Sequence, residues 1–269
     1  MVTPPSRRDV LTGTAGALAG VAGGFLARPH LAGGTSADGT ASQVPLAWAD
    51  TEWPYPDYDG ARTRHPPAQS APDTNLSRDW RIENDQNIFR TLPVVANGQV
   101  VAGTVDARWT TVRAIRLATG TVAWKQRFRG DYPDHPVLVA PGDGVYYRVD
   151  NTRFSVGLLG GANGERVWGL DDPPTGGWTV GGGRLYYGDR GTGALWTYDA
   201  RTGEVLWSRD VDDERLVVES FHPRFGVFAT SLGTLYALDP ADGTVRWTRP
   251  VPDHVETGPA VAGGRAFVT

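Results

Sequence analysis

The sequence has no cysteine, a single lysine (Lys125), and no apolar run of the ~20 residues that a transmembrane helix needs. Without cysteine the chain can form no disulfide, cysteine-ligated zinc site, iron–sulfur cluster, covalent c-type haem or lipid-modified N-terminal cysteine. The net charge of −4 reflects an excess of acidic over basic residues. Nucleic acid is therefore not an expected partner, because it requires a basic surface.

The residues that are abundant form turns or carry aromatic rings: 35 glycines, 20 prolines and 10 tryptophans in 269 residues. This composition is typical of short strands joined by many turns, and the length suffices for one large all-β domain or two small ones. Scarce lysine together with abundant aspartate resembles proteins of salt-loving archaea or of GC-rich genomes.

Near the N-terminus, Arg7 and Arg8 lie within residues 6–11 and precede a mild apolar run at 15–26. The pattern resembles a twin-arginine (Tat) export signal. Residues 1–32 are therefore interpreted as this signal or as an uncleaved N-terminal anchor, and only an uncleaved signal would contact the membrane. The resemblance implies an exported protein that is secreted or associated with the cell surface.

Residues 33–52 are small and polar and predict a flexible linker. Residues 53–78 predict an extended lead-in segment before a repeat domain at 79–269. Within the lead-in, Asn75 begins an Asn-Leu-Ser glycosylation sequon, a triplet that is also common by chance.

Four later segments share one pattern, in which a glycine precedes a tryptophan by four residues. The pairs are Gly120 and Trp124, Gly164 and Trp168, Gly203 and Trp207, and Gly243 and Trp247. Successive tryptophans are 44, 39 and 40 residues apart, and a period near 40 is typical of propellers with four-stranded blades. We expect each glycine in a hairpin turn at positive φ and each tryptophan wedged between neighbouring blades.

Residues 237–247, Ala-Leu-Asp-Pro-Ala-Asp-Gly-Thr-Val-Arg-Trp, closely resemble the repeat of PQQ-like β-propellers. That family includes quinoprotein dehydrogenases and the BamB-type outer-membrane assembly factor. Residues 53–63 resemble the segment that precedes the repeats in many archaeal members, although Arg64 stands where a glycine is usual. The resemblance implies an all-β propeller of four-stranded blades.

We expect about four full blades and a partial one. Trp80 lies 44 residues before Trp124 and is interpreted as the tryptophan strand of a blade that residues 259–269 help to complete. The chain then forms either a five-bladed ring with one three-stranded blade or an incomplete arc, and we favour the incomplete arc.

The cofactor-binding members of the family that the chain resembles hold pyrroloquinoline quinone (PQQ) and a calcium ion bound by carboxylates and amides. The resemblance also implies an aspartate base and often a vicinal cysteine pair in those members. Here cysteine is absent, no acidic cluster aligns with that calcium site, and no histidine pair has metal spacing. We therefore expect neither PQQ nor a metal, and no catalytic residue. Asp199 and Asp239 are interpreted as turn-stabilising acceptors, and residues 131–135 and 210–214 as polar loops.

These observations favour an extracytoplasmic, non-enzymatic scaffold that binds an unidentified envelope or extracellular protein or polymer. One alternative is a PQQ-dependent dehydrogenase or a degenerate remnant of one. A second is a carbohydrate-binding propeller in which Trp109, Trp178 and Trp196 stack on sugar rings. The simpler explanation of these three tryptophans is that they are core or blade-surface aromatics.

Overall fold

The fold is all-β wherever this computed structural model describes the chain. The described residues are 10–12 (backbone only), 54–64, 79–82, 88–89, 91–106, 108–129, 137–149, 155–171, 173, 176–212, 215–251 and 259–268. Within these ranges no helix is long and apolar enough to cross a membrane. The predicted export motif at Arg7 and Arg8, the linker at 33–52, Asn75 and the loop at 131–135 lie outside them.

Four antiparallel sheets of at least four strands follow one another along the chain. The first contains β2 (Ile88–Phe89), β3 (Val94–Ala96), β4 (Gln99–Val105), β5 (Trp109–Arg116) and β6 (Val122–Arg129). The second contains β7 (Val137–Val139), β8 (Gly144–Val149), β9 (Ser155–Gly160) and β10 (Arg166–Asp171). The third contains β11 (Trp178–Gly181), β12 (Arg184–Gly188), β13 (Ala194–Asp199) and β14 (Val205–Asp210). The fourth contains β15 (Val217–His222), β16 (Gly226–Ser231), β17 (Thr234–Leu238) and β18 (Val245–Pro250).

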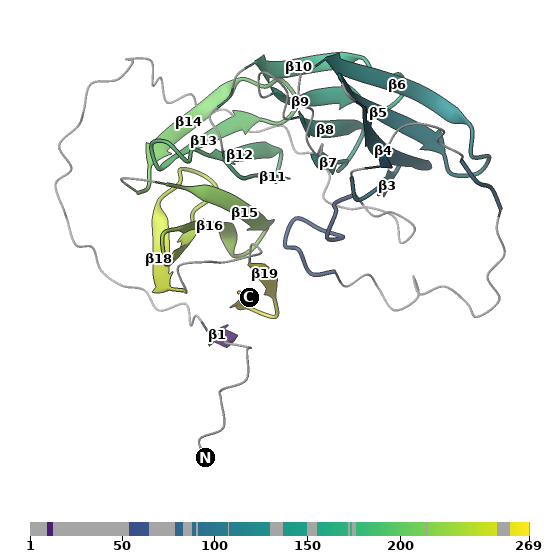
Figure 1. Ribbon diagram of the computed structural model, residues 1–269. Coiled ribbons are helices and arrows are strands. Elements are labelled where there is room, and N and C mark those ends of the chain that lie inside the picture. The colour runs from purple at the N-terminus through teal and green to yellow at the C-terminus, as the bar shows by residue number, and fades with distance from the viewer. Residues whose placement is uncertain are drawn as a thin grey trace.

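A smaller fifth sheet has the order β1 (Val10–Thr12), β20 (Arg265–Phe267), β19 (Ala260–Ala262). Figure 1 shows the sheets following one another in chain order along an arc, with β3, β7, β11 and β15 on its inner side and β6, β10, β14 and β18 on its outer side. In the first sheet, β2 and β3 pair with successive parts of the same edge of β4. The predicted all-β propeller with four full blades and a partial one is confirmed.

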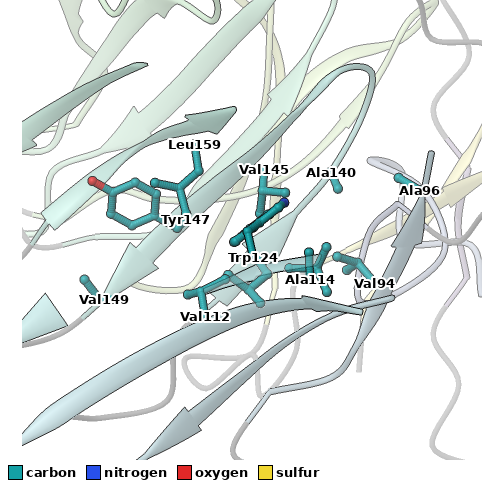
Figure 2. Packing of buried hydrophobic residues seen from close by; sticks show 12 residues of the cluster. Val94, Ala96, Val112, Ala114, Trp124, Ala140, Val145, Tyr147, Val149 and Leu159 are labelled. Carbon is teal, nitrogen blue, oxygen red and sulfur yellow. The ribbon is translucent and has the colours of Figure 1, made fainter. Parts of the chain in front are cut away.

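The hydrophobic core lies between neighbouring sheets. Val112 and Trp124 of the first sheet pack with Val145, Tyr147 and Leu159 of the second, as Figure 2 shows. Middle strands are largely buried, whereas the outer strand β6 is mostly exposed or half-buried. This is the burial expected when sheets stack face to face and each outer strand borders solvent.

Four tryptophans each pack against the glycine turn of the sheet that follows them in the chain. The contacts pair Trp80 with Gly120, Trp124 with Gly164, Trp168 with Gly203, and Trp207 with Gly243. We call these four turns the docking turns. Their glycines have φ between +69° and +74°, a conformation that glycine adopts without a Cβ clash. A side chain would also meet the ring: a Cβ on Gly203 would lie 2.6 Å from Trp168.

The first three indoles also donate a hydrogen bond to the residue three positions before the glycine. The acceptors are the carbonyl oxygens of Leu117, Gly161 and Ala200, at 2.6, 2.7 and 3.0 Å. At the fourth turn the equivalent Pro240 carbonyl instead accepts from Arg184 Nη1 and Tyr186 Oη. The buried Trp207 Nε1 accordingly has no partner among the described residues.

The two ends of the tryptophan series differ from its middle. Trp80, predicted on a strand, lies outside the named strands, although it docks as the others do. The predicted pairing of its strand with residues 259–269 is not seen, since β20 pairs with β1 and β19. Trp247 packs edge-on against Phe228, with ring centroids 5.9 Å apart, and near the Arg249 guanidinium.

Candidate functional site

Residues 54–64, which we call the inner segment, connect the inner strands of four successive sheets. The Pro54 carbonyl accepts from Ala140 N beside β7, and Tyr55 Oη donates to the Val180 carbonyl in β11. Farther along, the carbonyls of Gly60 and Ala61 accept from Phe221 N in β15 and Val261 N in β19. These four bonds measure 2.7 to 2.8 Å, so one short segment fixes the inner edge of the arc.

Two aspartates hold the inner segment in its conformation. Asp57, whose side chain is only 9% exposed, accepts from Arg62 Nε at 2.8 Å through Oδ2 and from Arg64 Nε at 2.6 Å through Oδ1. Asp59 accepts from both the backbone N and the hydroxyl of Thr63, at 2.9 and 2.7 Å. Both carboxylates are therefore engaged within the segment itself.

The backbone of the inner segment is strained at three non-glycine residues. Tyr58, Arg62 and Arg64 have φ of 78°, 59° and 51°. The left-handed conformation costs an L-residue roughly 1–2 kcal/mol. Such outliers persist where the surrounding contacts fix them, and they cluster at ligand clamps and active sites.

A cavity of about 340 Å³ opens beside the inner segment, within the size range of small-molecule sites. Its charged lining residues are Asp57, Asp59, Arg62, Arg64 and Arg148, and its apolar and aromatic ones include Tyr55, Leu92, Val139, Trp178 and Val218. Among the lining residues that the structure describes, the formal charges of three arginines and two aspartates sum to +1. We call this space the inner cavity.

Burial dominates the ionisation of two groups near the inner cavity. It raises the pKa of the Tyr55 hydroxyl far above its usual range, and Tyr146 and Asp59 add to the shift. Tyr55 therefore remains a hydrogen-bond donor. Burial also lowers the pKa of His222 below its ordinary value of 6.5, against the opposing effect of the Asp59 carboxylate.

The residues singled out in the sequence lie in different places. Asp199 Oδ1 accepts from the backbone N of Arg201 and Thr202, and Asp239 Oδ1 from that of Ala241, so both brace turns. Of the three tryptophans considered for sugar stacking, Trp178 lines the inner cavity, Trp109 lies under the Arg127 guanidinium, and Trp196 is half-buried.

Sequence reasoning did not identify the inner segment as part of a site. Its aspartates and arginines alternate with aromatic and small residues in a stretch interpreted as an extended lead-in. The opposite charges of Asp57 and of Arg62 and Arg64 could have indicated ion pairs within the segment. The sequence separation of these residues, however, matches no regular pairing along a helix or a strand.

The fold and its docking turns define the class of the chain, a β-propeller with tryptophan-marked repeats. Residues 152–223 and 224–269 match the protein family described as "Outer membrane protein assembly factor BamB" (PQQ_2). The repeats of this chain are thus PQQ-like, BamB-like propeller repeats. No curated protein is significantly similar to the chain in sequence.

Solved structures with a similar fold include quinohemoprotein alcohol dehydrogenase ADHIIG from Pseudomonas putida HK5, with a TM-score of 0.55 and 17% identity over 76% of the chain. A europium-containing methanol dehydrogenase has a TM-score of 0.56 and 14% identity over 77% of the chain. The quinohemoprotein alcohol dehydrogenase from Comamonas testosteroni has a TM-score of 0.55 and 18% identity over 81%. The matched parts span 40%, 50% and 45% of those proteins, and the likeness establishes the fold.

Proposed function

We propose that this chain is an exported, non-enzymatic propeller that acts as a binding scaffold for a protein or polymer of the cell envelope or its exterior. The observation that supports this proposal is the use of both inner-cavity carboxylates to hold the inner segment. Among the described lining residues, the cavity offers cationic and aromatic groups for binding, while both carboxylates are already engaged within the segment.

The cofactor implied by the fold family does not fit the residues described at this cavity. PQQ with calcium requires carboxylate and amide ligands that converge on the ion. Asp57 and Asp59 are the acidic residues of the lining, and both are engaged by Arg62, Arg64 and Thr63. No group of three or more His, Cys, Asp or Glu side chains in the described part of the chain could hold a metal ion.

The quinone proposal is tested on the purified protein. We expect that PQQ with Ca²⁺ produces no dye-linked oxidation of alcohols or sugars and no shift in melting temperature. Binding at about 100 times Kd would add about 2.7 kcal/mol of stability and would be visible. A saturable thermal shift with the quinone would overturn the scaffold assignment, even without turnover. As a control, the same protein preparation must unfold cooperatively in this buffer, which shows that it is folded.

Export is tested separately at the twin-arginine motif. We expect Arg7→Lys combined with Arg8→Lys to leave the protein in the cytoplasm, because the Tat route recognises the arginine pair. Immunoblots of cytoplasmic and exported fractions measure the outcome. Unchanged secretion of the double variant would contradict the proposed route.

A further inference from the structure

The hairpin formed by β5 and β6 is strongly basic, unlike its three counterparts. Residues 109–129 contain four arginines, the only lysine of the chain, and no aspartate or glutamate. The equivalent hairpins of the second, third and fourth sheets, at 155–171, 194–210 and 234–250, have formal charges of −1, −1 and 0. Since the whole chain has a net charge of −4, positive charge is concentrated on this one hairpin.

Three of these cationic side chains lie on one face of β6. Lys125, Arg127 and Arg129 occupy alternate positions and are all exposed. Alternate residues of a strand point to the same face, so the three groups form a row that repeats every second residue. Trp124 and Phe128, at intervening positions, pack toward the second sheet. We call Lys125, Arg127 and Arg129 the basic row.

Trp109 of β5 supports the middle of the basic row. The Arg127 guanidinium lies 4.3 Å from the centroid of the Trp109 ring, and stacking on an indole leaves the N–H donors in the guanidinium plane available. Arg127 Nη2 also lies 3.8 Å from Asp106 Oδ2, and the two side chains are 48% and 32% exposed, so water screens this ion pair. A ligand carboxylate can therefore reach Arg127 while the indole keeps the guanidinium in place.

The strand that carries the basic row is also an edge strand. β6 pairs with β5 on one side, and among the described residues no strand pairs with its other side. Figure 1 shows β6 on the outer side of the arc, and its eight residues make it longer than β10, β14 and β18, which have six each. The free edge of such a strand presents backbone N–H and C=O groups with which an extended peptide can pair.

The charge of the basic row determines which strand this edge can accept. Like charges directly opposite one another destabilise a pair of strands, whereas opposite charges stabilise it. A second copy of β6 would place cations against cations, so the basic row disfavours self-association at this edge. A strand with acidic residues at alternate positions would instead place one carboxylate opposite each cation.

We propose that β6 binds an extended polypeptide segment with acidic residues at alternate positions, which joins the first sheet as a further strand. The proposal rests on the binding function proposed above and names the surface and the chemistry of the partner. Backbone hydrogen bonds to the free edge hold the segment, and the basic row selects its sequence.

Isothermal titration calorimetry on the full-length protein tests the proposal with matched peptides. The probe is the acetylated and amidated heptapeptide Thr-Glu-Val-Glu-Val-Glu-Thr, and its control has the same composition with the three glutamates adjacent. We expect the alternating peptide to bind about tenfold more tightly, because only its carboxylates can all lie opposite the basic row.

A second pair of peptides tests the backbone pairing separately from the charge. In a strand, the N–H groups of alternate residues point to opposite edges. One version of the probe is N-methylated on its glutamates and the other on its valines, and both keep all the carboxylates. Strand addition predicts that one version loses about tenfold or more in affinity while the other binds like the probe.

Two double variants test whether the peptide binds at β6. Lys125→Glu with Arg129→Glu should weaken binding of the probe by about tenfold or more. Arg209→Glu with Arg249→Glu changes the net charge equally, at exposed arginines of β14 and β18, and should leave the affinity unchanged. Thermal unfolding shows that both variants are folded. The N-methylated peptides need only the wild-type protein, so the test holds even if a variant fails to fold.

The proposal is overturned if the probe does not bind, if the control with adjacent glutamates binds as tightly, if both N-methylated peptides bind alike, or if the two double variants lose affinity equally. Tighter binding of trigalacturonate or of a uridine trinucleotide would also overturn it, because these short polyanions have no peptide backbone. None of these results bears on quinone binding or export, so the β6 site can fail while the proposed scaffold function stands.

Discussion

The docking turns and the inner segment both fasten neighbouring sheets, but by different means. On the outer side of the arc, the same indole-on-glycine contact recurs at the three boundaries between the first four sheets. On the inner side, one segment makes a different hydrogen bond to each of four sheets, contains three non-glycine residues at positive φ, and borders the cavity. The repeated contacts join neighbouring sheets, and the single, unrepeated element forms one side of the inner cavity.

The largest expected loss of stability comes from replacing a tryptophan that docks on a glycine turn, and Trp247, which docks on none of the described glycine turns, provides the comparison. Trp124 is 6% exposed, packs on Gly164 and donates to the Gly161 carbonyl, so Trp124→Ala should lower the free energy of unfolding by about 3–5 kcal/mol. Trp247 is half-buried at the edge of a hydrophobic cluster, where it makes an edge contact with Phe228 and a cation–π contact with Arg249, and no glycine turn among the described residues packs against its ring. Trp247→Ala should lower it by about 1–2 kcal/mol. Urea unfolding measures both, and equal losses would show that docking on a glycine turn adds nothing.

A second prediction, of intermediate size, separates the tryptophan–glycine packing contact from the left-handed backbone conformation of the glycine. Gly164 and Gly98 have similar φ of 71° and 68°, but an added Cβ would overlap the Trp124 ring at Gly164 and meet open space at Gly98. Gly98→Ala should cost about 1 kcal/mol from the left-handed conformation alone, and Gly164→Ala about 2–4 kcal/mol. Thermal unfolding of the pair measures the difference. If the two losses match, the docking turns tolerate a side chain and the packing account is wrong.

The smallest effect belongs to the inner segment. Asp57→Asn removes the charge that holds Arg62 and Arg64, and it should destabilise the protein by about 1–3 kcal/mol. Trypsin should then cut faster after Arg62 or Arg64 than in the wild type, because the segment opens locally. Asp59→Asn is the matched control, since the amide oxygen can still accept from Thr63 N and the amide nitrogen can donate to the Thr63 hydroxyl oxygen. Similar cleavage of the two variants would mean that the ion pairs do not hold the segment.

The sequence predicted the outer contacts well because they repeat. The spacing of Trp124, Trp168 and Trp207 indicated the sheets, and the glycines four residues earlier indicated the turns. The sequence did not predict that Trp80 docks from outside a strand. Docking requires an indole against the glycine turn, and it does not require that the tryptophan be hydrogen-bonded within a sheet.

The inner segment could not be predicted for a physical reason. Its ion pairs form only when Tyr58, Arg62 and Arg64 adopt positive φ, a conformation that local propensity disfavours for all three. The surrounding strands impose it through bonds from residues 140, 180, 221 and 261. Contacts so distant in sequence and so irregular leave no periodic signal.

The docking contacts all point the same way along the chain, and this gives the molecule a direction of assembly. Each indole closes on an acceptor that is synthesised later, 37, 37 and 32 residues downstream for Trp80, Trp124 and Trp168. Such short loops keep contact order low, and stacked repeats propagate structure from neighbour to neighbour. During translation, each sheet should therefore lock as the next turn leaves the ribosome. Arrested nascent chains long enough for a docking turn to have left the ribosome should resist protease up to the preceding sheet, whereas shorter chains that keep the turn inside the ribosome should not.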